Sequence, residues 1–216
     1  MTLAGQEINM PRLLLEPKVL VNTHILRSFD KGSILKNLFG CILDSKRAKY
    51  HKMLPILLAD IFEAIGGVDL AVLDGTYFWQ GAGNSPVQTN TVIVGKDAVA
   101  VETVGAVLSG LNPQKMSILQ EFVRRGLGEG DMKHIEIVGA PFESIRDKFR
   151  SAAMAQKKEK ARHKSPQTWG GQVNRVLKGL IHEGFFTQPN KRTMEDVIKA
   201  IERKGLPIQG KESKIM

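Results

Sequence analysis

Strand-like and helix-like segments alternate along the first two thirds of the chain, and this pattern constrains the fold more than any other feature. Val68–Leu73 is a nearly continuous apolar run, which is typical of a strand covered on both faces. A helical stripe at 54–65 precedes it and ends at Gly66-Gly67, and another helix is predicted to begin at Asp97, its N-cap. Such alternation predicts an α/β fold, with a mostly parallel sheet covered by helices.

The segment 74–90 is the predicted connection between two strands of this sheet. It follows the buried run directly and contains Gly81 and Gly83, so we expect a long loop. A further strand is expected at 135–138, which closes the series. In α/β sheets, ligands bind at the carboxyl ends of the strands, and the predicted loop is therefore the first candidate for a site.

Positive charge is concentrated in the last third of the chain. Residues 1–145 contain 14 Lys and Arg against 15 Asp and Glu, whereas residues 146–216 contain 17 against 7. Such asymmetry is typical of an arm that meets phosphate groups or an acidic surface. The alternative is a lysine-rich helix face that is simply solvated.

The sequence predicts three parts along the chain. They are an α/β domain at 1–145, a basic helical connector at 146–166, and a small, basic, all-helical module at 167–216 that resembles a helix-turn-helix. Ser165-Pro166 is expected to end the connector helix. Thr193 is the predicted N-cap of the last helix in the module.

Cysteine content and hydropathy exclude several classes of protein. Cys41 is the single cysteine, so one chain forms neither a disulfide nor a cysteine-ligated iron–sulfur cluster. Apolar runs are broken well before the roughly 20 residues that a bilayer crossing requires, and the first residues do not have the pattern of a signal peptide. We therefore expect a cytoplasmic protein without membrane contact.

Several short strings appear in an order that is typical of one family. They are Leu35–Gly40, Lys46–His51, Leu73-Asp74-Gly75, Gly81-Ala82-Gly83, Val99-Ala100-Val101 and Gly126-Leu127-Gly128. On these strings, the chain between Pro11 and about Gly139 resembles the domain-of-unknown-function family numbered 362. The tail resembles, more loosely, a winged-helix-like module of archaeal proteins that carries a Glu-Gly-Phe-Phe string, here at 183–186.

The chain also departs from the pattern of that family. Arg27 and Phe29 stand where the family usually has lysine and histidine, Gln80 replaces a usual glutamate, and Glu102 replaces an aspartate. The resemblance therefore implies a divergent, non-catalytic member that has lost a potential metal ligand and an acid/base group. The chain begins late in the family pattern, which implies a shortened form whose missing amino-terminal strands a partner chain supplies.

Five residues are candidates for holding a small anionic ligand: Lys36, Asn37, Asp74, Gly81 and Gly83. A lysine, an amide and backbone N–H groups near a strand end can hold phosphate or carboxylate, and the glycines can form an anion-binding nest. Each residue also has an ordinary structural interpretation. Lys36 can be merely exposed, Asn37 locally bonded, the Asp-Gly pair a turn, and the two glycines part of a flexible loop.

His24 and His51, together with Asp74, form a candidate site for a divalent metal, because imidazole and carboxylate groups suit zinc, iron or nickel. The distances between these residues do not follow from the sequence. Each histidine, taken alone, is as well explained by surface exposure or packing.

Residues 146–216 supply the candidates for contact with nucleic acid or with an acidic protein. The basic side chains that can neutralise phosphates are Lys157, Lys158, Lys160, Arg162, Lys164, Arg175, Lys178, Lys191 and Arg192. The leading hypothesis is a non-catalytic protein that binds a small anion or metal and docks through this region. The alternatives are a metal-dependent enzyme that uses Lys36, His51 and Asp74 and is completed by a partner chain, or a scaffold subunit.

Overall fold

A computed structural model describes residues 1–16, 19–28, 31–80, 85–164, 169–183 and 193–206 of the 216-residue chain. The chain divides into two compact units, Met1–Gln156 and Lys157–Met216, and each is described by itself. Among the helices that these residues form, none has both the length and the apolar character needed to cross a membrane.

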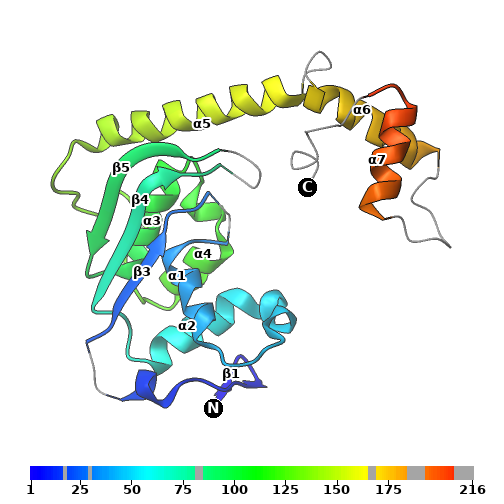
Figure 1. The fold of residues 1–216 in the computed structure, drawn as a ribbon. Coiled ribbons are helices and arrows are strands. Elements are labelled where there is room, and N and C mark those ends of the chain that lie inside the picture. The colour runs from blue at the N-terminus through cyan, green and yellow to red at the C-terminus, as the bar shows by residue number, and fades with distance from the viewer. Residues whose placement is uncertain (17–18, 29–30, 81–84, 165–168, 184–192, 207–216) are drawn as a thin grey trace. The chain divides into compact units, whose positions relative to one another are not determined.

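The first unit combines short strands with helices (Figure 1). Its strands are β1 (Thr2–Leu3), β2 (Gln6–Glu7), β3 (Val21–Ile25), β4 (Leu70–Phe78) and β5 (Val87–Gly95). Its α-helices are α1 (Ile34–Asn37), α2 (Leu54–Ala64), α3 (Ala98–Leu108), α4 (Ser117–Arg124) and the first part of α5 (Phe142–Lys164). Short 3-10 turns occur at η1 (Arg12–Leu15), η2 (Leu38–Cys41), η3 (Arg47–Met53) and η4 (Pro113–Lys115).

The central sheet is mixed, with the strand order β3-β4-β5. β3 pairs with β4 in parallel, with Val21 opposite Leu70 and Ile25 opposite Asp74. β4 pairs with β5 in the antiparallel direction, with an irregular register between Gly75 and Tyr77. The prediction of an α/β fold is confirmed. The prediction of a mostly parallel sheet is wrong, because one of the two ladders is antiparallel.

The antiparallel ladder arises where the sequence predicts a long loop. The segment 74–90 instead continues β4 to Phe78 and begins β5 at Val87, so most of it lies in a β-hairpin. Antiparallel strands accept a short connection, whereas a parallel pair requires a crossover of a dozen residues or more. The strand predicted at 135–138 is also wrong, since this segment forms no ladder in the structure.

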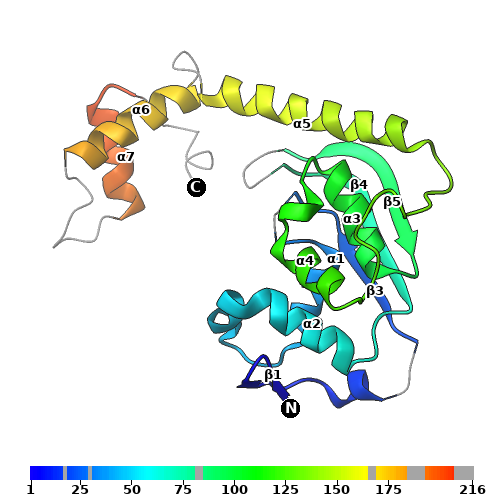
Figure 2. The same ribbon diagram turned by 180° about the vertical axis from the view of Figure 1, so that it is seen from behind.

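One face of the sheet carries the helices. Ala71, Leu73 and Phe78 of β4 are buried on that face, and α1, α3 and α4 lie on the same side in both ribbon views (Figures 1 and 2). The other face is open among the described residues, and its side chains include Val92 and Val94, which are 56% and 57% exposed. The expectation of a strand covered on both faces is therefore wrong for β4.

Helix α3 lies close to the sheet because of a glycine. A Cβ atom on Gly105 would lie 2.5 Å from Leu73 Cδ2 and 3.0 Å from Leu26 Cδ1, so only glycine permits this approach. The N-terminus of α3 is capped by Asp97, as predicted: its Oδ1 accepts hydrogen bonds from the N–H groups of Val99 and Ala100. The helix thus forms a fixed floor beneath β4 and β5.

Glu102 is a buried acidic residue on α3 that holds the start of α1. Its carboxylate accepts hydrogen bonds from Ser33 N at 2.8 and 2.9 Å and from Leu35 N at 3.0 Å. Gly32 lies against it, since a Cβ there would come within 3.3 Å of the carboxylate. Burial raises the pKa of Glu102, although the backbone donors act in the opposite direction.

This raised pKa predicts a pH-dependent stability. Below the pKa of the unfolded state, the carboxyl group is protonated in both states and its contribution to stability is fully present. As the pH rises, the unfolded state ionises first, so the free energy of unfolding should decrease until the folded pKa is passed. Urea unfolding of wild type and of Glu102→Gln across pH 4–8 measures this: the advantage of wild type should shrink with rising pH. An advantage that grows with pH would show that the backbone donors dominate.

The second unit contains the rest of α5, α6 (Trp169–His182) and α7 (Met194–Arg203). A small core holds α6 against α7, formed by Val173, Leu180, Ala200 and Ile201. Thr193 and Asp196 form a capping box at the start of α7, which confirms the predicted N-cap. The C-terminal region is therefore helical, as expected.

Candidate functional site

Asn37 has a structural role at the end of α1. Its side-chain Nδ2 donates hydrogen bonds to Asn22 Oδ1 at 2.8 Å and to the Thr23 carbonyl at 3.0 Å. Asn22 is itself buried and donates to the Ile34 carbonyl at 2.9 Å. This amide network ties α1 to β3, and the donors of Asn37 are used within it.

Lys36 and His24 lie on the helix-covered side of the sheet. His24 is half-buried, and burial lowers its pKa, with the nearby charges of Arg27 and Lys36 lowering it further. A histidine held neutral among cations is a poor proton donor at neutral pH. The group is electropositive and belongs to the α1 side of β3.

Asp74 points to the opposite side. It pairs with Ile25 in the register, whereas His24 pairs with Leu73, and successive side chains alternate between the two faces of a sheet. Asp74 is exposed, and hydrogen bonds from the hydroxyl and N–H of Thr76 lower its pKa. The structure therefore separates Asp74 from His24 and Lys36.

The remaining candidates are not brought to Asp74 either. His51 lies in η3, where its ring is 5.3 Å from that of Phe39. Gly81 and Gly83 fall outside the described residues. Among the side chains that the structure describes, no group of three or more His, Cys, Asp or Glu residues is placed to hold a metal ion.

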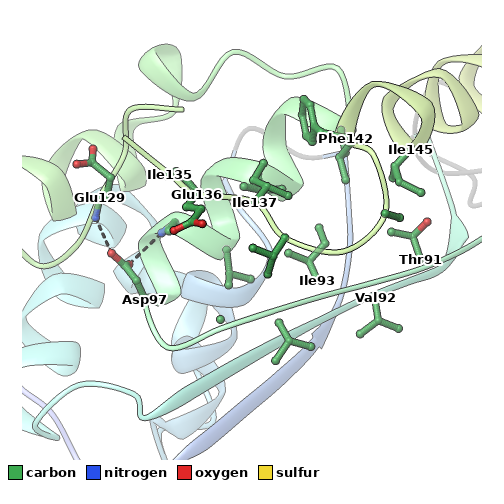
Figure 3. A pocket seen from close by; sticks show the side chains of 18 of the residues that line it. Thr91, Val92, Ile93, Asp97, Glu129, Ile135, Glu136, Ile137, Phe142 and Ile145 are labelled. Carbon is green, nitrogen blue, oxygen red and sulfur yellow. Dashed lines mark hydrogen bonds between the residues drawn. The ribbon is translucent and has the colours of Figure 1, made fainter. Parts of the chain in front are cut away.

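A pocket of about 580 Å³ lies along β5 instead (Figure 3). Its walls come from four segments: β5 at 90–96, α3 at 97–108, the connection at 129–140, and the start of α5. Most side chains that line its interior are apolar: Ile93, Val101, Val104, Leu108, Ile135, Ile137, Phe142 and Ile145. Its volume falls within the range that is usual for ligand sites.

Asp97 joins two walls of this pocket. Oδ1 caps α3, while Oδ2 accepts a hydrogen bond from Glu129 N at 2.8 Å, so one carboxylate fixes both the helix and the connection that follows α4. Gly128 makes this possible, since a Cβ there would collide with Asp97 Oδ1 and lie 2.7 Å from Val99 Cβ. The sequence identifies Asp97 as a cap but gives no indication of the second contact.

Charged groups gather at the same end of the pocket as Asp97. Figure 3 shows Asp97, Glu129 and Glu136 together there, with Phe142 and Ile145 at the other end. Glu129 accepts from Asp131 N at 2.7 Å and lies 3.3 Å from His134 Nδ1. Glu136 is exposed and pairs with no other described side chain. The pocket thus has carboxylates at one end and mainly apolar side chains, together with Thr91, at the other.

The structure describes only some of the basic side chains that are predicted to contact nucleic acid or an acidic protein. Lys157 and Lys158 on α5, and Arg175 and Lys178 on α6, are exposed. The side chains of Lys160, Arg162 and Lys164, and the whole of Lys191 and Arg192, lie outside the described part of the chain.

These features define an α/β protein with a small mixed sheet packed against helices and a helical C-terminal region. Residues 5–107 match the family described as Domain of unknown function (DUF362), so this part of the chain is a domain of that family. The match includes β3, β4, β5 and α3, but neither the 129–145 wall of the pocket nor the basic region. No curated protein and no solved structure matches the chain.

Proposed function

We propose that this DUF362 family member binds nucleic acid through the phosphate backbone, using the basic region at 146–216. The observation that carries the proposal is the charge of that region, which has 17 Lys and Arg against 7 Asp and Glu, a surplus of ten. A surplus of this size in one short region attracts phosphate and makes binding dependent on salt.

The exposed basic side chains support this interpretation. Lys157, Lys158, Arg175 and Lys178 are exposed and form no ion pair with another described residue. Other charges of the region are already used, since Lys199 pairs with Glu195 at 2.7 Å and Lys204 with Glu183 at 2.7 Å. The four exposed side chains are therefore among the described cations that are available to phosphate oxygens.

The packing of α6 leaves one of its faces for such contacts. Val173 and Leu180 turn toward α7, whereas Arg175, Lys178 and His182 follow at helical spacing on an exposed face. Lysine and arginine here contact phosphates without reading sequence, so we expect affinity with little base specificity.

Charge reversal of the four side chains tests the proposal. A variant with Lys157, Lys158, Arg175 and Lys178 changed to Glu should bind labelled RNA and duplex DNA at least about tenfold more weakly at about 0.1 M salt. Its salt dependence should also flatten, by about 0.9 in the log–log slope for each duplex phosphate that the variant no longer neutralises. Fluorescence anisotropy over a salt series measures both quantities.

The matched control carries the same change in net charge on the first unit. Lys46, Lys52, Lys115 and Lys133 are exposed there, and their replacement by Glu should change the affinity far less. If binding is weakened equally in the two variants, the loss of affinity is due to net charge alone. That result would reject a binding site in the basic region. Binding of acidic proteins, but not of RNA or DNA, would instead assign the region to a protein partner.

Substitution is a cleaner test than truncation. Phe149, Ala152 and Gln156 lie within 146–216 but are buried in the first unit. Gln156 Nε2 donates to the carbonyls of Phe78 and Ser85 at 2.7 and 2.8 Å. Removing the whole region would therefore expose the core of the sheet domain and confuse impaired binding with impaired folding.

A further inference from the structure

The free edge of β5 forms one wall of the pocket. The described sheet ends at β5, which pairs with β4 alone. Seven consecutive residues, 90–96, line the pocket. Side chains alternate between the two faces of a strand, so a wall formed by one face would contain only every second residue. Because consecutive residues line the pocket, the wall includes the edge of the strand and its main chain. A free edge presents backbone N–H and C=O groups that can pair with another strand.

The opposite wall comes from a segment without regular secondary structure. Ile135 and Ile137 line the pocket from a segment that forms no ladder, although its sequence is rich in β-branched residues. Val104 and Leu108 of α3 form the floor between the two walls. The space is therefore a slot that runs along a strand, with apolar positions beside it.

The charge distribution restricts what enters this slot. Three carboxylates, those of Asp97, Glu129 and Glu136, lie at one end of the pocket. The cations of this end are Lys96, which precedes Asp97 in the sequence, and His134, which lies 3.3 Å from Glu129. Carboxylates exceed cations there even when His134 is protonated. Asp97 and Glu129 are occupied by backbone donors, so Glu136 is the carboxylate available to an incoming cation.

We propose that this pocket binds an extended peptide segment of a partner protein, which adds to the edge of β5 as a fourth strand. The segment is apolar at alternate positions and carries a lysine or arginine at the end that reaches Glu136. Main-chain hydrogen bonds to β5 supply the general affinity, while the apolar pocket and the acidic end select the sequence. A small apolar molecule would fill the walls but leave the backbone groups of β5 unused.

Two synthetic peptides test the proposal, Lys-Lys-Val-Thr-Val-Thr-Val and Val-Thr-Val-Thr-Val-Lys-Lys. One places its lysines near Glu136 if it pairs with β5 in parallel, and the other does so if it pairs in the antiparallel direction. We expect one of them to bind the full chain, with amide chemical-shift changes confined to β5 and the pocket walls. N-methylation of alternate amides removes the donors of one peptide edge and should weaken that peptide at least about tenfold.

A charge swap tests the acidic end. Glu136→Lys should weaken the lysine peptide about fivefold, and a peptide with Glu-Glu in place of Lys-Lys should bind this variant better than wild type. Glu202→Lys is the matched control, since Glu202 is exposed on α7 in the other unit, and it should change neither affinity.

Three results would overturn the proposal. They are no binding of either peptide, equal binding of the N-methylated form, or shifts that lie outside β5 and the pocket walls. Hydrogen exchange gives a further check, because edge amides of β5 that are already protected in the free protein would mean that the 135–138 segment occupies the edge itself.

Discussion

Phe149→Ala is expected to lower the free energy of unfolding of the first unit by about 3–5 kcal/mol. Phe149 is fully buried on α5, and its ring meets that of Phe78 edge-on, with the ring centroids 5.1 Å apart. It also covers Gly75, where a Cβ would lie 3.0 Å from Phe149 Cζ. Removing the ring leaves a cavity against β4 and deprives Phe78 of its aromatic neighbour.

Urea unfolding followed by the fluorescence of Trp79 measures this effect. Trp79 lies in the first unit and Trp169 in the second, so a Trp169→Phe background isolates the signal. Met154→Ala is the control on the same helix, because Met154 is 51% exposed, and it should cost less than about 0.5 kcal/mol. A decrease below about 1 kcal/mol for Phe149→Ala would mean that α5 contributes little to the core of this unit.

Helices and their ends were the part of the fold that the sequence could predict. Asp97 and Thr193 cap α3 and α7 as expected, and α2 ends where Gly66 and Gly67 adopt positive φ values of 76° and 83°. These signals are local, because a cap or a stop needs only its own neighbours in the sequence. The basic helix predicted at 146–166 is found for the same reason as part of α5, which runs from Phe142 to Lys164.

The sheet could not be predicted in the same way, because strand pairing depends on distant residues. Gly81 and Gly83 indicate a long loop when they are read alone, yet β4 and β5 pair over much of the segment 74–90. Conversely, the β-rich segment 135–138 has no partner in the described sheet. Local propensity is a weak guide where the partner strand decides the outcome.

The candidate site shows the same limit. His24 and Asp74 lie in neighbouring strands, but the register places them on opposite faces. The pocket along β5 joins segments that span 55 positions of the sequence, from Asn90 to Ile145, and only the cap at Asp97 marks it in the sequence. The order of residues along a strand does not reveal which face is open, since that depends on how the helices pack.

Asp97→Ala is expected to lower the free energy of unfolding by about 2–4 kcal/mol. The variant removes an N-cap, which alone is worth about 1 kcal/mol, and it leaves Glu129 N without its acceptor in a part-buried position. Two elements therefore loosen together, the start of α3 and the 129 end of the pocket wall. Urea unfolding measures the total, and hydrogen exchange at Ala100 and Glu129 separates the two contributions.

A graded series distinguishes the two roles of this carboxylate. Asp97→Asn retains one oxygen for the cap but replaces the other with an amide that cannot accept from Glu129 N, so it should lose about half as much stability as Asp97→Ala. Asp131→Ala is the control, because Asp131 caps only the exposed Lys133 N at 3.0 Å, and it should lose less than about 1 kcal/mol. In Asp97→Asn, exchange should accelerate at Glu129 while Ala100 stays protected. Equal acceleration of exchange at Ala100 and Glu129 would show that one oxygen cannot hold the helix alone. The cap and the bond to the pocket wall would then form one cooperative unit.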